Sequence, residues 1–513
     1  MRPTGTGTRP RIVKTGRIGM RPYIGIFQMK SGKGFSKRLF YNNLIRVVVL
    51  LLTLTLFLSA CSENTNQNMT TVQIGLENVG TPAPGATDAA SGANRGIADK
   101  PLGRIIVSVW TGGWKGNFDN EKALASVIDE YRKLYPLVTF EWRDWGNDLS
   151  AKLEQAWKGT LDKGITTPDL VLVSPTDLYQ YAASGYLEAF NDYSEFTSRR
   201  ADFVPAALDT CKVATVYYCM PWLAETRLTL INKRLWSLAG LDAAKLPRTF
   251  DDWDAIMPTI VKKTPDEVRA VWLKPDPLTD FLLEDLPLFQ GEGSSRTPAF
   301  NNPVTQARWL NYQSNLKSGA LMREALDGNS QDALNRFIGG TLAVWMDGGD
   351  SLAALKGISA SNYSQNTLVT LNPVSKPGIV PYQSKGVWVV PKSAKNKSRA
   401  VDFAGFLSND QNQLNFARIM SPFTAVPTVQ KALSDPFITD TADLLAQARS
   451  LTASALSNAK PPEKLLPYPL SADNRAKLLT ALTDAQRKIW SGTTPPAQAL
   501  FEADKIWAEV LKQ

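Results

Sequence analysis

The chain has 513 residues, with 57 lysines and arginines, 48 aspartates and glutamates, 3 cysteines and no histidine. This length suggests two to four domains or one large two-lobed unit, and a 43% apolar fraction with 14 tryptophans excludes a disordered chain. Without histidine there can be no Ser-His-Asp or Cys-His nucleophile system, no His-Glu-x-x-His zinc site and no histidine-ligated haem. Three cysteines also exclude a four-cysteine zinc or iron–sulfur site within one chain.

The positive charge is concentrated at the N-terminus. The formal net charge is +9, yet residues 1–60 alone hold 11 basic residues and no acidic one. This leaves 46 basic against 48 acidic residues from Cys61 onward, so the rest of the chain carries a charge near −2. A nucleic-acid partner, which a basic protein would otherwise suggest, is therefore not expected.

The same N-terminal segment has the pattern of a secretory signal. Residues 47–58 form an apolar run of about a dozen residues, short of the roughly 20 that span a bilayer. A basic stretch followed by such a run is typical of an exported protein. Met20 or Met29 could be the true first residue, since either start keeps a basic region before the apolar run.

The apolar run ends in Leu-Ser-Ala-Cys, with the cysteine at position 61. This resembles the bacterial lipobox, which implies that residues 1–60 are a signal peptide and that Cys61 is lipidated. A lipid anchor would hold the protein on the outer face of the cytoplasmic membrane, in an extracytoplasmic or periplasmic location. The alternative is an ordinary signal peptide with a cysteine nearby by chance. Residues 61–100 contain no aromatic residue and are predicted to form a flexible tether.

Export makes a disulfide possible for the two remaining cysteines. Cys211 and Cys219 flank a β-rich segment, residues 212–218, that could fold back as a hairpin. A bridge across so short a loop is feasible if the two Cα atoms approach within about 7 Å. The alternative is a pair of buried free thiols.

From residue 104 to about 221, strands and helices alternate along the chain. Strands are predicted at 105–110, 137–142 and 169–173, and helices at 120–134, 147–161 and 176–183. A glycine-rich turn at 111–113 follows the first strand. This alternation predicts βαβ units and a parallel sheet, which binds ligands beyond the carboxyl ends of its strands.

After Pro221 the pattern is less regular. A strand at 227–231 and a helix at 232–239 precede a stretch, 251–337, that is predicted to be mainly helical. Further strands are predicted at 341–346, 368–371 and 386–390. The last predicted elements are helices, at 399–419, 442–455, 475–490 and 495–512.

Several segments carry a family resemblance when they are taken in order. They are residues 104–110, 168–173, 182–188, 220–221, 230–241, 247–253, 337–348, 386–391, 400–407, 491–492 and 495–500. The ordered set covers residues 104–511, although no single segment is specific. It resembles the extracellular solute-binding proteins of ABC transporters, family 1, and within them the sugar-binding group that includes maltose-binding protein. Three departures from the family pattern exist. Ile231 stands where the family usually has a tyrosine, and the run Tyr218–Met220 replaces the family's glycine before the hinge proline. Residues 264–298 match little.

The resemblance implies an α/β, two-lobed periplasmic-binding-protein-like fold of class II, in which each lobe is a central sheet flanked by helices. Lobe 1 would comprise residues 101–222 and 389–440, and lobe 2 residues 227–385 and 441–513. The chain would cross the hinge at 221–227 and 385–391. The resemblance also implies a monomer without catalytic activity, metal or cofactor that delivers a mono- or oligosaccharide to ABC permease subunits.

Sugars present apolar C–H faces to aromatic rings and hydroxyls to polar side chains. Four tryptophans stand at the end of the first strand, after its glycine turn, or at the predicted crossings, and are candidate ligand contacts. They are Trp110, Trp114, Trp222 and Trp388. Each could instead be a core residue.

The polar candidates fall into three sets. Ser174, Thr176 and Asp177 follow the third strand, where they could also cap a helix. The resemblance places a sugar-binding carboxylate at Glu225 on the hinge. Asp347 and Asp350 surround a Gly-Gly turn after a strand of lobe 2 and could equally serve that turn. An approximate alignment adds Asp276 and Tyr468.

Two other functions remain open from the sequence. A secreted glycosidase acting through two carboxylates is one, but among 48 acidic residues candidate pairs carry no information. The other is a binding protein for a solute that is not a sugar.

Overall fold

A computed structural model describes residues 72–73, 104–114, 118–291, 296–328, 330–346, 352, 355, 363–375, 379–420 and 424–512. All of these belong to one compact unit, Thr70–Gln513. The predicted signal segment, the lipidation site Cys61 and most of the predicted tether lie outside the described residues, as do Asp347 and Asp350. Within the described residues, no helix combines the length and hydropathy that a membrane span requires.

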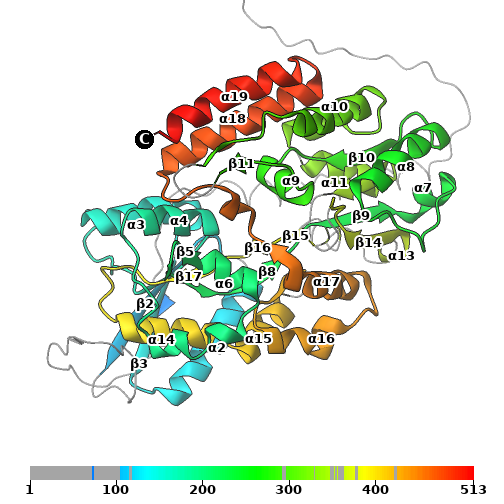
Figure 1. The fold of residues 1–513 in the computed structure, drawn as a ribbon. Coiled ribbons are helices and arrows are strands. Elements are labelled where there is room, and N and C mark those ends of the chain that lie inside the picture. Colours follow the sequence, from blue (N-terminus) through cyan, green and yellow to red (C-terminus); the bar gives the residue numbers. More distant parts are fainter. Residues whose placement is uncertain are drawn as a thin grey trace, which may run out of the picture. The chain divides into compact units, whose positions relative to one another are not determined.

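The first sheet belongs to lobe 1 and has the strand order β1-β3-β2-β4-β17-β7 (Figure 1). Three predicted strands, β2 (Ile105–Thr111), β3 (Val138–Asp144) and β4 (Leu170–Val173), run parallel to one another. The sheet is completed by β17 (Val387–Val389), β7 (Met220–Pro221) and the two-residue strand β1 (Val72–Gln73). The carboxyl ends of β2 and β4 therefore meet at one edge of this sheet.

Helices cover both faces of this sheet. They are α2 (Phe118–Leu134), α3 (Leu149–Lys158), α4 (Pro175–Ala183), α6 (Pro205–Cys211), α14 (Lys397–Leu407) and α15 (Asp410–Ile419). In α2 the residues Ala123, Leu124, Val127, Ile128 and Tyr131 are at most 1% exposed. Their spacing is that of one helical face, so α2 packs on the sheet through an apolar stripe.

The second sheet forms lobe 2 and has the order β10-β13-β9-β14. Its strands are β10 (Arg269–Leu273), β13 (Leu342–Met346), β9 (Leu228–Asn232) and β14 (Thr367–Leu371). β10 and β13 run parallel, and β9 is antiparallel to β13 and β14. A separate apolar core, which includes Trp236, Trp253, Trp309, Trp490 and Trp507, packs this sheet against its helices.

The helices of lobe 2 begin and end where local signals place them. For example, α8 (Phe250–Lys263) starts with a capping box in which Thr249 and Asp252 each accept the other's backbone N–H. The remaining helices of this lobe are α7 (Lys233–Leu238), α9 (Pro277–Leu283), α10 (Pro303–Lys317), α11 (Ser330–Ile338), α13 (Tyr363–Asn366), α17 (Leu444–Ala455), α18 (Ala472–Ser491) and α19 (Pro496–Val510).

The remaining strands are short. They are β5 (Lys212–Val213), β6 (Val216–Tyr217), β8 (Leu223–Glu225), β11 (Phe289–Gln290), β12 (Thr297–Pro298), β15 (Val380–Pro381), β16 (Gln383–Ser384), β18 (Val426–Pro427) and β19 (Ala459–Lys460). β5–β6 and β11–β12 are local hairpins, whereas β16, β8 and β18 form a small sheet where the chain passes between the lobes. The chain passes from β8 to β9 at residues 226–227, inside the predicted crossing at 221–227. It returns between β14 and β17, at residues 372–386, mostly before the predicted crossing at 385–391.

Three expectations need correction. Residues 251–337, which are mainly helical as predicted, also contain β10, an edge strand of the second sheet that pairs in parallel with β13. The helix expected over 399–419 is two helices, because Asn409 caps α15 by accepting the backbone N–H of Asn412. The tether expected over 61–100 contributes β1, which pairs with β3 at the edge of the first sheet, where backbone groups would otherwise be unpaired.

Asp169 shows how lobe 1 is held together across its sequence. Its side chain is buried and accepts the backbone N–H groups of Ser108, Lys395 and Asn396 at 2.9–3.1 Å, and also the Asn396 amide. One carboxylate thus joins β2, β4 and the loop before α14. The aspartate of the Pro168-Asp169 segment is a structural residue rather than a ligand contact.

Helix α9 joins the sheet edge of lobe 2 to its C-terminal helices through Asp280. This side chain is buried, and its Oδ2 accepts hydrogen bonds from the Gln486 amide of α18 at 2.7 Å and from the backbone N–H of Asp276 at 3.2 Å. Burial, together with the nearby carboxylates of Asp276 and Glu284, raises the pKa of Asp280 to about 8, and Arg227 only partly opposes this. The folded protein therefore retains a proton that the unfolded chain releases near pH 4.

This proton makes stability depend on pH. Between about pH 4 and pH 8 the folded state binds one proton more than the unfolded state at Asp280, so the free energy of unfolding falls as pH rises. Replacing Asp280 by Asn keeps both acceptor contacts and removes the titration. We expect Asp280→Asn to gain stability relative to the wild type as pH rises, by at most about 1.4 kcal/mol per pH unit. Urea unfolding at pH 5, 6, 7 and 8 measures this, with Asp484→Asn on the exposed face of α18 as the control. Parallel pH profiles for Asp280→Asn and the wild type would contradict it.

Cys211 and Cys219 form a disulfide with a Cα–Cα distance of 5.0 Å, around the β5–β6 hairpin. The bridge closes a loop with a sequence separation of 8 residues. Both cysteines are fully buried in the core of lobe 1. Of the two alternatives that the sequence leaves open, the structure has the disulfide and not a pair of free thiols.

We expect the double substitution Cys211→Ala with Cys219→Ala to lower the free energy of unfolding by about 2–3 kcal/mol, because the unfolded chain regains the entropy of a short open loop. Urea unfolding of the wild type under oxidising conditions provides the reference. The wild type in reducing buffer should approach the double variant. An unchanged midpoint in both cases would show that the bridge contributes nothing.

Candidate functional site

The first part of the candidate site is the turn that follows β2. Asp144, at the end of β3, accepts hydrogen bonds from the Thr111 hydroxyl at 2.8 Å and from the backbone N–H of Trp114 at 3.0 Å. The indole N–H of Trp142 donates to the same Thr111 hydroxyl at 2.9 Å. The glycine-rich turn is therefore fixed at the carboxyl edge of the first sheet, where a ligand is expected.

The four candidate tryptophans are all buried. Trp114 lies 5.2 Å from Trp222 and 6.1 Å from Trp388, measured between ring centroids, and Phe416 packs against Trp114 and Trp222. Trp110 packs edge-on against Trp145 at 5.0 Å. Trp114 is 6% exposed and the other three at most 1%. In this conformation they are core residues, the alternative that the sequence left open, and three of them form an aromatic wall behind the β2 turn.

The polar residues after β4 are more accessible. Ser174 is the N-cap of α4: its Oγ accepts the backbone N–H of Asp177 at 3.1 Å, and its hydroxyl donates to the Asp177 carboxylate at 2.8 Å. Ser174 and Thr176 are exposed and Asp177 is half-buried. Capping thus orients these side chains and leaves them available at the same edge as the β2 turn.

Glu225 lies where the chain leaves lobe 1. It is 6% exposed, forms an ion pair with Lys385 at 2.8 Å and accepts a hydrogen bond from Thr424 at 3.5 Å. The next residue, Thr226, donates its hydroxyl to the Pro381 carbonyl at 2.7 Å. Glu225, the predicted hinge carboxylate, therefore lies among the strands that connect the lobes. It is held by Lys385, on the segment through which the chain returns to lobe 1.

Asp276 lies at the carboxyl end of β10, in lobe 2. Its carboxylate forms an ion pair with Arg227 of the crossing strand and accepts the Thr279 hydroxyl at 3.1 Å. Its side chain remains 34% exposed, whereas that of Arg227 is 8% exposed. Because β13 runs parallel to β10, the residues that follow each strand share this edge of the second sheet.

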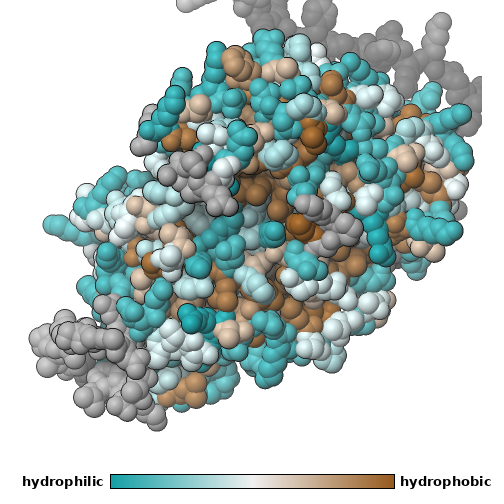
Figure 2. All heavy atoms as spheres, viewed as in Figure 1, coloured by the Kyte–Doolittle hydropathy of each residue, from teal (hydrophilic) through white to brown (hydrophobic). Residues whose placement is uncertain are grey.

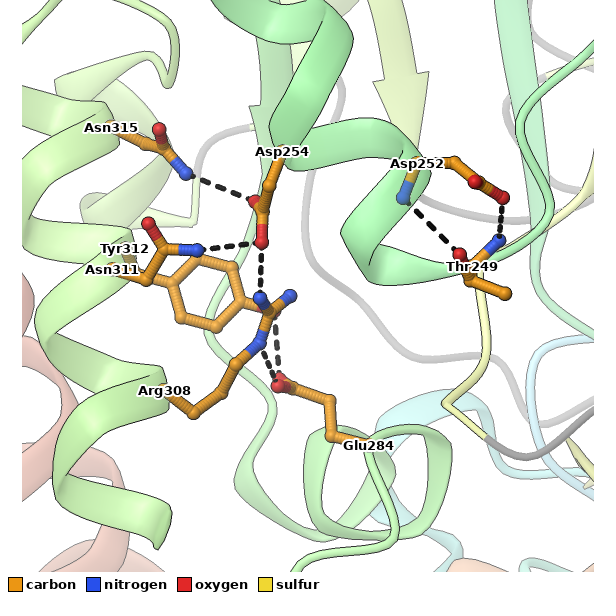
Figure 3. Close-up of polar contacts among 8 residues, drawn as sticks. All are labelled: Thr249, Asp252, Asp254, Glu284, Arg308, Asn311, Tyr312 and Asn315. Atoms are coloured by element: carbon orange, nitrogen blue, oxygen red, sulfur yellow. Dashed lines mark hydrogen bonds and ion pairs between the residues drawn. The ribbon is translucent and has the colours of Figure 1, made fainter. Parts of the chain in front are cut away.

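A buried ion-pair network holds the other end of α9 (Figure 3). Arg308 of α10 binds Glu284 and Asp254, and the amides of Asn311 and Asn315 donate to the same Asp254 carboxylate at 2.6 and 3.2 Å. The Tyr312 hydroxyl donates to Glu284 at 2.7 Å. Burial raises the pKa of Glu284, although Arg308 and Tyr312 act against it. These residues satisfy one another's hydrogen-bonding groups, so their role is to fix α9 and not to bind a ligand.

Tyr468 lines a small pocket between the two lobes. One wall comes from lobe 1, with Tyr179 of α4 and Ala214 of the β5–β6 turn, and the other from lobe 2, with Glu463, Tyr468 and Arg475. Its volume of about 50 Å³ is far below the roughly 300–1,000 Å³ of pockets that hold a whole small molecule.

On the face shown in Figure 2, apolar residues gather in a hollow near the centre of the view.

The structure thus places these candidates at four locations. Trp114, Ser174, Thr176 and Asp177 lie at the carboxyl edge of the first sheet, Asp276 at that of the second, and Glu225 at the crossing. Tyr468 faces the inter-lobe pocket. Among the described residues, no cluster of three or more potential metal ligands is found.

Sequence reasoning missed Arg227, Asp280, Arg308 and Arg475. One signal was available, because Asp276, Asp280 and Glu284 recur every four residues and so share one helical face. An apolar segment that carries three acids on one face predicts buried basic or amide partners elsewhere in the chain. The identity of those partners depends on tertiary contacts.

Comparison with known proteins agrees with this geometry. The family model described as bacterial extracellular solute-binding protein matches residues 115–414, more than half of the chain. The maltotriose-binding protein of Pyrococcus abyssi is 21% identical over 347 residues, which cover 66% of this chain and 69% of that protein. The diacetylchitobiose binding protein DasA of Streptomyces coelicolor is 26% identical over 197 residues, 33% of this chain and 44% of its own length.

Solved structures share the fold at low sequence identity. The sugar-binding protein MalE from Xanthomonas citri has a TM-score of 0.65 and 19% identity, covering 80% of this chain and 98% of that one. The GacH receptor of Streptomyces glaucescens, solved unliganded and with acarbose, has a TM-score of 0.62 and 19% identity, covering 80% of this chain and 100% of that one. With the family model and a shared two-lobed fold, the chain belongs to the bacterial extracellular solute-binding proteins.

Proposed function

We propose that the protein is the substrate-binding component of an ABC importer that captures an oligosaccharide between its lobes and delivers it to membrane permease subunits. The observation that carries the proposal is the arrangement of polar side chains at the carboxyl edges of both sheets. Thr176 and Asp177 stand on one edge and Asp276 on the other, with Glu225 on the strand between them. Relatives named for binding maltotriose and diacetylchitobiose support a carbohydrate ligand.

Binding of this kind needs a change in lobe separation and no covalent chemistry. A ligand that contacts both edges stabilises the closed state over the open one, by the difference between its affinities for the two states. The disulfide-linked hairpin and Asp169 keep lobe 1 rigid, and α9 keeps lobe 2 rigid, so the motion is confined to the connecting strands. The closed form is then what the permease recognises.

A thermal-shift screen of the protein from residue 62 onward tests this function. We expect maltotriose, diacetylchitobiose or a related oligosaccharide to raise the melting temperature, because a ligand at a hundredfold excess over Kd adds about 2.7 kcal/mol to the free energy of unfolding. Glu225→Gln should reduce the shift, whereas Glu267→Gln, an exposed residue before β10, should leave it unchanged. If no sugar raises the melting temperature, the proposal is contradicted. If sub-stoichiometric protein releases cleaved sugar, the protein is a hydrolase instead.

The location of the protein is part of the same proposal. A lipid on Cys61 and the residues between it and β1 would tether the binding domain to the outer face of the cytoplasmic membrane as a monomer. Because β1 pairs with β3, a flexible tether would reach from Cys61 only to Val72, roughly 17 Å for about ten residues.

We expect Cys61→Ser to release the protein from membranes into the soluble extracytoplasmic fraction, since the thiol is the site of acylation. Membrane fractionation of cells that express the wild type or the variant provides the measurement. Cys211→Ala with Cys219→Ala is the matched control and should remain membrane-bound. Membrane association of Cys61→Ser equal to that of the wild type would refute lipidation.

A further inference from the structure

The pocket beside Tyr468 has chemistry that the binding of a neutral sugar does not use. Lobe 1 contributes Tyr179 and Gln180 of α4, and lobe 2 contributes Glu463, Lys464, Tyr468 and Arg475. Its α4 residues lie one helical turn along α4 from Thr176 and Asp177, which stand at the carboxyl edge of the first sheet. At about 50 Å³ it can accept a small group that projects from a ligand, but not a sugar ring.

Arg475 is an unpaired buried cation in this pocket. Its side chain belongs to α18 and is only 9% exposed, and its Nε has no hydrogen-bond partner. Among the described residues it forms no ion pair, and a buried guanidinium nitrogen without a partner is costly. Burial lowers the pKa of Arg475, and Glu463 and Tyr179 only partly oppose this. The side chain is therefore placed to accept a partner that the protein itself does not provide.

The neighbouring groups leave this charge uncompensated. Lys464 already binds Asp209 at 3.5 Å and donates to the Lys212 carbonyl. Burial raises the pKa of the Glu463 carboxyl group, which also lines the pocket, although Arg475 acts against this shift. The pocket thus combines Arg475, which forms no ion pair among the described residues, with a carboxyl group whose charged form burial disfavours.

Two further features orient the pocket toward an anion. Ala472, the first residue of the long helix α18, lines the pocket, so the positive end of that helix dipole lies there. Tyr179 is fixed by its hydroxyl, which donates to the Thr210 carbonyl at 3.1 Å, and the Arg475 guanidinium lies 5.9 Å from its ring centroid. The tyrosine ring supports the guanidinium in place without neutralising it.

We propose that this pocket binds the carboxylate of an acidic sugar unit, so that the ligand of the protein is an oligosaccharide containing a uronate. The inference rests on the proposed function, because it assigns a substrate class to the same inter-lobe site. The carboxylate would pair with Arg475, and the Tyr468 ring at the exposed rim, 39% accessible, would face the sugar that carries it. Since the pocket has walls from both lobes, the anion would also favour the closed state.

The test compares an acidic oligosaccharide with its uncharged methyl ester and with a neutral sugar. Isothermal titration of the protein from residue 62 onward is performed with tri-galacturonate, its fully methyl-esterified form and maltotriose. We expect tri-galacturonate to bind at least tenfold more tightly than its methyl ester, because the ester removes the charge and preserves the sugar skeleton. Arg475→Met should abolish this difference and leave the affinity for the methyl ester within twofold, while Arg487→Met, an exposed arginine of the same helix, should change neither.

The outcomes separate the two proposals. Equal affinities for the acid and its ester in the wild type would overturn the uronate inference while sugar binding itself stands. If tri-galacturonate, its methyl ester and maltotriose all fail to bind, the result contradicts the proposed function as a sugar-binding protein. Glucose 6-phosphate and inorganic phosphate are titrated in parallel, and Arg475-dependent binding of phosphate without any of tri-galacturonate would overturn the carboxylate assignment. The comparison of acid and ester uses the wild type, so it stands even if Arg475→Met folds poorly, which its thermal unfolding reports.

Discussion

The ion pair between Arg227 and Asp276 fixes the relation between the strand that leaves lobe 1 and the edge of lobe 2 where a ligand is expected. Arg227 is nearly buried on the crossing strand, and Asp276 is the residue that begins α9. Removing either partner would leave an uncompensated charge, so the pair is costly to break even if its net stabilisation is small. The position of the second carboxyl edge relative to the hinge depends on it.

Helix α9 carries this constraint into the rest of lobe 2. Its acids face three different elements: Asp276 meets the hinge strand, Asp280 meets α18 through Gln486, and Glu284 meets α10 through Arg308 (Figure 3). Because Asp280 and Glu284 are buried and Asp276 pairs with the nearly buried Arg227, this short helix connects the hinge to the C-terminal helices. Lobe 1 has a comparable device in Asp169, and its aromatic wall of Trp114, Trp222 and Trp388 supports the ligand edge from behind. A binding site built on such supports can hold its polar groups in place before the ligand arrives.

The sequence predicts the parts of this structure that depend on local pattern. The parallel strands of lobe 1, the cap at Ser174, the hairpin between the cysteines and the position of Glu225 all follow from periodicity, short-range chemistry or family resemblance. Strand β10 was missed because its Arg-Ala-Val-Trp-Leu run is short and lies within a helical region. The sequence leaves the role of the four tryptophans open, because an aromatic residue at a strand end has the same sequence signature whether it faces a ligand or the core. Arg475 could not be found, since an arginine on an amphipathic helix normally faces solvent and only its tertiary neighbours bury it.

The distribution of charge explains how such a protein could select an anion. The chain from Cys61 onward carries a charge near −2, so it offers no general attraction for an acidic ligand, and at physiological ionic strength surface charges act only over about 8 Å. Selection must then occur at close range, where low polarity strengthens a single contact. A guanidinium that is buried, supported by a tyrosine ring and left without a partner meets this requirement. Its Nε is already desolvated in the folded protein, so less water has to leave the guanidinium when a carboxylate arrives.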